Sequence, residues 1–106
     1  MYEQRTIIID RGVYTSLQVD LTDYDFSGIQ KVVMTFKNTP LSSEPLFTRE
    51  FTEKAVHNVI ITPAESKLLT VGAECDFIRV TGDNKCYKDG DNYKIKLREG
   101  CGQCQM

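Results

Sequence analysis

Short runs of alternating apolar and polar residues recur along the chain, and turn residues separate them. In the segment from Leu17 to Leu21 every second residue is apolar, which predicts a strand with one buried face. The longest run, 29–38, is expected to bury alternate residues, namely Val32, Met34 and Phe36. Val33 breaks that alternation, so we expect part of this strand to be covered on both sides.

The remaining strand-like runs are short and follow one another at regular spacing. They span 6–9, 46–52, 56–61, 73–81, 85–88 and 93–98. The run 73–81 changes phase midway, because Ala73, Cys75 and Phe77 share one face while Ile78 and Val80 share the other. This switch predicts a β-bulge or a strand that crosses between two sheets.

One segment, 62–69, has the pattern of a short helix. Thr62 is suited to the N-cap, Pro63 to the first helical position, and Glu65 to the reciprocal position of a capping box. Gly72 then releases the chain into the next strand. We expect this helix to connect two strands at one end of the fold.

These elements predict an all-β fold, an immunoglobulin-like two-sheet sandwich of about seven strands with one short helix at about 62–69. A small barrel is the main alternative. Residues 1–100 are expected to form a single β-sandwich domain, and 101–106 a short tail that contains Cys101 and Cys104.

Composition narrows the function classes without selecting one. The chain has 106 residues, of which 41% are hydrophobic and 26% charged, with a net charge of −2. That mildly acidic balance gives no general attraction to nucleic acids or anionic membranes, so neither partner is expected. The N-terminus lacks a signal-peptide pattern and no apolar run reaches membrane-span length, which predicts a cytoplasmic protein.

Two acidic segments resemble parts of a calcium loop. Asp23-x-Asp25-x-Ser27-Gly28 matches the start of such a loop, but its bidentate acid would fall at Met34, which has no oxygen ligand. The segment 89–92, Asp-Gly-Asp-Asn, begins with Asp-Gly, which indicates a tight turn more strongly than a calcium loop. Both are therefore expected to be polar turns.

The four cysteines offer a second candidate chemistry. Cys101 and Cys104 have the spacing of half a zinc site or of a redox pair, whereas Cys75 lies in phase with core residues and Cys86 stands apart. Two ordinary thiols in a terminal tail are the favoured interpretation. Metal binding, a disulfide and free thiols at Cys101 and Cys104 stay open.

No reactive constellation emerges from the other residues. His57 is the only histidine, and no nucleophile-elbow sequence accompanies it. A sugar-stacking platform would need a cluster among the five tyrosines, Tyr2, Tyr14, Tyr24, Tyr87 and Tyr93. The sequence therefore predicts no catalytic, cofactor-binding or metal-binding residue, no cofactor, and no enzymatic activity.

The order of the elements resembles that of bacteriophage and prophage structural proteins, especially the N-terminal domain of phage baseplate upper proteins. The resemblance covers about 6–98. It rests on the strand and turn ending at Gly12, the acidic loop before Gly28, the long strand 32–37, the capped helical turn from Thr62, and the Gly-led strand from Gly72. The Cys-rich tail departs from that family.

The resemblance implies a non-enzymatic structural or assembly module of a phage tail or baseplate. Its partners would be other phage structural proteins, with a homo-oligomer left open. The protein would be cytoplasmic until it is assembled into a virion. The alternative function is that of a carbohydrate- or receptor-binding sandwich module, and a metal or redox role for Cys101 and Cys104 is the third hypothesis.

Overall fold

The computed structural model describes residues 6–39, 44–88 and 92–99. Within these ranges it contains eight strands and one helix, where about seven strands were predicted. In chain order they are β1 (Thr6–Arg11), β2 (Thr15–Asp20), β3 (Ile29–Lys37), β4 (Phe47–Phe51), β5 (Val56–Ile61), α1 (Pro63–Leu68), β6 (Glu74–Thr81), β7 (Cys86–Lys88) and β8 (Tyr93–Glu99).

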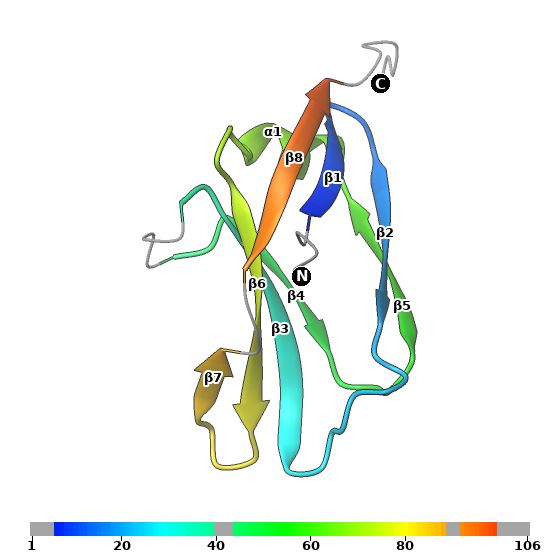
Figure 1. Cartoon of the computed structure of the whole chain (residues 1–106), viewed down its shortest axis with the longest axis vertical. Coiled ribbons are helices and arrows are strands. Elements are labelled where there is room, and N and C mark those ends of the chain that lie inside the picture. Colours follow the sequence, from blue (N-terminus) through cyan, green and yellow to red (C-terminus); the bar gives the residue numbers. More distant parts are fainter. Residues whose placement is uncertain (1–5, 40–43, 89–91, 100–106) are drawn as a thin grey trace, which may run out of the picture.

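The strands form two sheets that face each other (Figure 1). The larger sheet has the order β1-β8-β6-β3-β4, with β7 paired to the far end of β6, and the smaller one pairs β2 with β5. All pairs are antiparallel except β1 with β8. This sandwich confirms the predicted fold class, and its strand order follows an immunoglobulin-like Greek key.

The core lies between the two sheets. From β3, the alternate residues Val32, Met34 and Phe36 are almost fully buried, as their phase predicts. Ile61 from β5 and Ile9 from β1 are also fully buried. Phe36 stacks on Phe47 of β4, with ring centroids 4.5 Å apart. Burial of these apolar side chains is the main stabilisation of the fold.

The phase switch in β6 has a different origin from the two that were predicted. β6 stays in one sheet, and the register irregularity lies in β3 between Ile29 and Lys31, at the end of the pairing. Ile78 pairs with Val33 on the outer face of the sheet, and both are half-buried there. β6 therefore carries apolar side chains on both faces without leaving its sheet.

The helix α1 carries the chain from the small sheet to the large one, as predicted. The Thr62 hydroxyl accepts from the Glu65 N–H at 3.2 Å, and the Glu65 carboxylate accepts from the Thr62 N–H at 3.1 Å, which completes the capping box. Gly72 then has φ +94°, in a turn closed by the Ala73 N–H to the Thr70 carbonyl. No helix in the described part of the chain is long and apolar enough to cross a membrane.

Candidate functional site

The two sheets meet along two seams, and one of them, between β4 and β5, is bridged by Arg49. The residue pairs with the inward-facing Met34, so its side chain enters the space between the sheets. One guanidinium nitrogen donates to the Ile60 carbonyl of β5 at 3.0 Å and to the Glu65 carboxylate at 2.6 Å. This contact joins the large sheet, the small sheet and α1 at a single point.

The other seam, between β1 and β2, is bridged at one end only by the residues that the structure describes. The Asp10 N–H donates to the Thr15 hydroxyl at 3.0 Å, and the Gly12 N–H donates to the fully buried Ser66 hydroxyl at 2.9 Å. Ser66 in turn donates to the Pro63 carbonyl. These bonds fix the β1–β2 turn on α1, and β1 and β2 diverge below that turn (Figure 1).

Below the turn, the seam opens into a cavity of about 440 Å³ between the sheets. We call it the seam cavity. Apolar and aromatic side chains from both sheets line it, including Ile7, Leu17, Val19, Met34, Phe77 and Tyr93. Its size is within the usual range of ligand sites. It opens beside β2, since Gln18 and Asp20 belong to its lining.

Among the described residues, the backbone of β2 presents one unpaired edge to this opening. β2 pairs with β5 alone among the described strands, and the Leu21 N–H donates to the Ala55 carbonyl at 2.9 Å. Because backbone groups alternate between the two sides of a strand, those of Leu17 and Val19 point to β5 as Leu21 does. The N–H and C=O groups of Ser16, Gln18 and Asp20 therefore point away from β5.

Asp20 is the one charged side chain among the described residues that line the seam cavity. Its carboxylate accepts from the Thr22 hydroxyl at 2.6 Å and from the Thr22 N–H at 3.0 Å. These hydrogen bonds lower the pKa of the Asp20 carboxyl group, because they stabilise its charged form. The open end of the cavity is thus apolar with a negative charge at its rim.

The structure assigns local roles to the residues of the first calcium-like loop. The Asp25 carboxylate accepts from the Ser27 N–H at 2.9 Å, which lowers the pKa of Asp25 and closes a turn. Gly28 has φ +71°, as a turn of this shape requires. Within the described ranges, no three His, Cys, Asp or Glu side chains converge on a point that could hold a metal ion.

The second acidic turn and the terminal cysteines lie wholly or partly outside the described residues. Asp89, Gly90, Asp91, Cys101 and Cys104 belong to this group. Asn92, the last residue of that turn, donates from its amide to Glu74 at 2.6 Å.

The surroundings of the two described cysteines and of the histidine are typical of structural rather than reactive residues. Cys75 is fully buried, and desolvation together with Asp76 raises the pKa of its thiol, which opposes the reactive thiolate. Cys86 is exposed on β7. His57 packs its ring against Phe51 at 4.8 Å, and its Nε2 lies 2.8 Å from the Glu53 carbonyl. Within the described ranges, no activating partner is recorded beside any of the three.

The described tyrosines do not share one exposed face. Tyr24 and Tyr93 line the seam cavity, where Tyr93 meets Phe77 edge-on at 5.5 Å. Tyr14 lies in the β1–β2 turn and Tyr87 on β7, at opposite ends of the molecule (Figure 1). Tyr2 lies outside the described residues.

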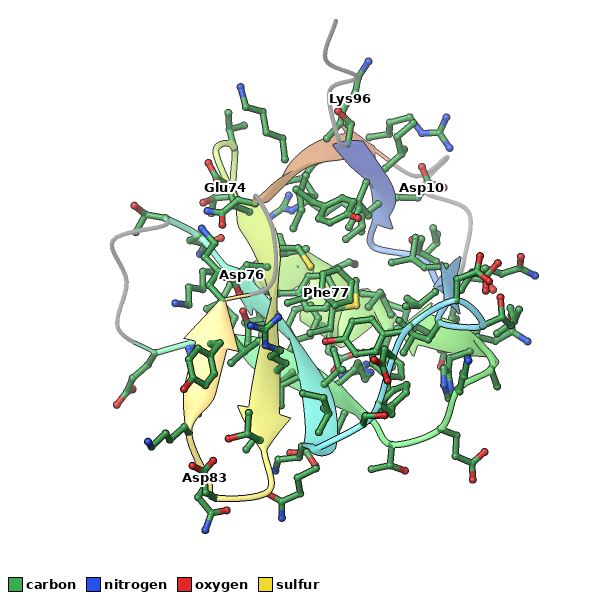
Figure 2. All side chains as sticks on the ribbon, turned by 60° about the horizontal axis from the view of Figure 1, so that its bottom comes forward. Asp10, Glu74, Asp76, Phe77, Asp83 and Lys96 are labelled. Atoms are coloured by element: carbon green, nitrogen blue, oxygen red, sulfur yellow. The ribbon has the colours of Figure 1, made fainter. Side chains whose placement is uncertain are left out.

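Carboxylates are likewise dispersed. Figure 2 shows Asp10, Glu74 and Asp83 well apart near the edge of the molecule, whereas Phe77 points into the interior. Asp76 is half-buried and hydrogen-bonds with Thr35. The Arg98 side chain lowers the pKa of Asp10, and a hydrogen bond from Thr81 lowers that of Asp83. Lowered pKa values suit permanent anions rather than a general acid, which needs a raised one.

Sequence reasoning missed the residues of the unpaired edge, Ser16, Gln18 and Asp20. The alternation from Leu17 to Leu21 predicted the buried face of β2, but an edge position depends on which strands pair, and that is not local information. A usable signal did exist for Arg49. It shares the phase of Phe47 and Phe51, so the same alternation that buries both rings turns Arg49 inward.

Comparisons with protein-family models, with curated proteins and with solved structures find no match for this chain.

Proposed function

We propose that the chain is a non-enzymatic assembly module that binds another protein at the seam cavity. The observation that carries this proposal is the combination of an apolar cavity with the unpaired edge of β2. Apolar surface left accessible beside unpaired backbone groups is the usual chemistry of a protein-docking surface. The surroundings of Cys75 and His57 add support, since both groups are held in structural contacts.

We further propose that the assembly is a phage or prophage tail or baseplate. This part rests on the order of the elements, from the acidic loop after β2 to the capped helix between β5 and β6. Carbohydrate binding has less support, because it needs several exposed tyrosines on one face and the described exposed ones, Tyr14 and Tyr87, lie far apart.

The test is co-expression with the proteins encoded by neighbouring genes, followed by size-exclusion chromatography with light scattering. We expect a stable complex with at least one of them. Leu17→Asp places a charge in the seam cavity and is expected to abolish the complex. The matched control, Ile60→Asp, changes a 46% exposed residue on the outer face of the same sheet and is expected to leave it intact.

Circular dichroism verifies that both variants fold. The proposal would be overturned if no complex formed with the product of any neighbouring gene and the gene itself lay far from tail and capsid genes.

A further inference from the structure

One extended peptide could satisfy both the β2 edge, which needs backbone hydrogen-bond partners, and the seam cavity, which needs apolar side chains. The edge offers N–H and C=O groups from Ser16, Gln18 and Asp20 at every second residue. An extended peptide main chain satisfies such a row, whereas a helix has used its own backbone groups internally. A strand laid along β2 would also direct alternate side chains between the sheets, where the cavity lies.

The lining of the cavity indicates where side chains of an added strand would go. Ile7 of β1 and Tyr93 of β8 line the side opposite β2, and the inner face of the large sheet contributes Val32, Met34 and Phe77, so the cavity extends from the β2 edge inward between the sheets. At about 440 Å³ it holds several apolar side chains. The occupant must therefore supply apolar side chains as well as backbone groups.

A second copy of the chain meets only half of this requirement. Pairing of two β2 edges would satisfy the backbone groups, but the inward side chains of the copy, Leu17 and Val19, already face its own core. Such a dimer would leave both cavities unfilled. A segment from a different protein, with side chains free to enter, fits better.

The negative charge of Asp20 at the rim of the cavity favours a partner with a positive charge at the same end. Asp20 is ionised and no cation lines the cavity in the described part of the chain. Asp23 and Asp25 follow in the same loop. A positive residue in the partner at this end complements the rim, while a negative one is repelled.

We propose that the open seam accepts an extended segment of another protein as an added strand along β2, with apolar side chains at alternate positions and a lysine or arginine beside Asp20. This inference rests on the proposed assembly function and names its partner's chemistry. It describes recognition by strand addition, in which main-chain bonds give affinity and alternate side chains give specificity.

The probe is a short synthetic peptide in which valine and threonine alternate, with lysine at both ends. Amide hydrogen exchange of the full chain is followed by NMR with and without this peptide. We expect exchange at Ser16, Gln18 and Asp20 to slow by about tenfold or more at saturation. A twin peptide with glutamate at both ends should bind about three- to fivefold more weakly. A twin with proline at its centre should give no protection.

Two proline variants provide a matched pair. Gln18→Pro removes an N–H that points away from β5, so it should reduce peptide affinity by about tenfold while the β2–β5 ladder persists. Asn58→Pro removes an N–H on the far edge of β5, so it should leave peptide affinity within about twofold. Thermal melts verify that both variants fold.

Unchanged exchange at Ser16, Gln18 and Asp20 with millimolar lysine peptide would overturn the inference. So would equal peptide binding by both proline variants. A dimer in sedimentation that Gln18→Pro abolishes would identify a second copy as the occupant and would also overturn it. If a complex with a neighbouring gene product forms but leaves these amides unprotected, strand addition fails and the assembly function stands.

Discussion

Each of the two seams of this sandwich lies between an edge strand of the large sheet and a strand of the small sheet, but one seam is closed and the other is partly open. At the β4–β5 seam, Arg49 enters from one sheet and hydrogen-bonds the backbone of the other and the carboxylate of Glu65. At the β1–β2 seam, bonds through Thr15 and Ser66 hold one end, and the remainder borders a cavity of about 440 Å³. An inward-pointing charge is a known way to protect a sheet edge. The charge at one seam and the cavity at the other support the proposal that the second seam binds a partner.

The largest expected effect contrasts an aromatic side chain of the core with one that borders the seam cavity. Phe36→Ala removes a fully buried ring stacked on Phe47, and we expect it to lower the free energy of unfolding by about 3–5 kcal/mol. Phe77→Ala removes a half-buried ring that already borders the seam cavity, so it should cost about half as much or less. Chemical denaturation measures both. Equal losses would show that the seam cavity is packed as tightly as the core.

The closed end of the β1–β2 seam depends on one buried hydroxyl. Ser66→Ala leaves the Gly12 N–H without its acceptor, and we expect a loss of about 1–3 kcal/mol. Denaturation midpoints check the value, and Ser16→Ala, an exposed change on β2, serves as control. A neutral Ser66→Ala would mean that the turn is not fixed by this bond.

Arg49→Ala tests the bridge of the closed seam. We expect it to cost about 1–2 kcal/mol, because it removes charge-assisted bonds to Glu65 and to the Ile60 carbonyl from side chains that are largely shielded from water. The control is Lys31→Ala, which breaks the more exposed pair with Glu50 and should change stability by no more than about 0.5 kcal/mol. Similar effects would show that Arg49 behaves as an ordinary surface cation.

The same bridge should give a small acid-dependent signal. The hydrogen bond from Arg49 lowers the pKa of Glu65 from its ordinary value of 4.5, so the folded state favours the charged form. The resulting stabilisation is present above pH 4.5 and is lost as the pH falls through the lowered pKa. Asp10, Asp20, Asp25 and Asp83 act in the same direction, so the measurement is the difference between the unmodified chain and Glu65→Gln across this window. That difference should shrink on acidification, and a constant difference would contradict the account.

Local patterns predicted the helix cap and the buried face of β3, but not the Arg49 bridge of the closed seam. The capping box of Thr62 and Glu65 was predicted, because it depends on residues three positions apart. The inward phase of Val32, Met34 and Phe36 was predicted from alternation alone. The ion pair between Glu65 and Arg49 was not predicted, because the two residues are 16 positions apart and meet only when the two sheets pack together.

The open seam is a property of topology rather than of any segment. Leu17 and Val19 indicate a buried face, but nothing in their spacing tells whether a further strand lies beside β2. The phase switch at Phe77 and Ile78 has another origin than a bulge or a sheet crossing, because β6 carries apolar residues on both faces. Phe77 faces the space between the sheets, and Ile78 pairs with Val33 on the outer face. The phage assignment stays a prediction from element order.

Amide hydrogen exchange of the chain alone tests the central claim most directly. If β2 has an open edge, the Gln18 N–H should exchange far faster than the Val19 N–H beside it, which points to β5 and is protected by the ladder. The expected contrast is at least about a hundredfold. Equal protection of Gln18 and Val19 in the monomer would show that this edge is already covered, and would contradict the account of an open seam.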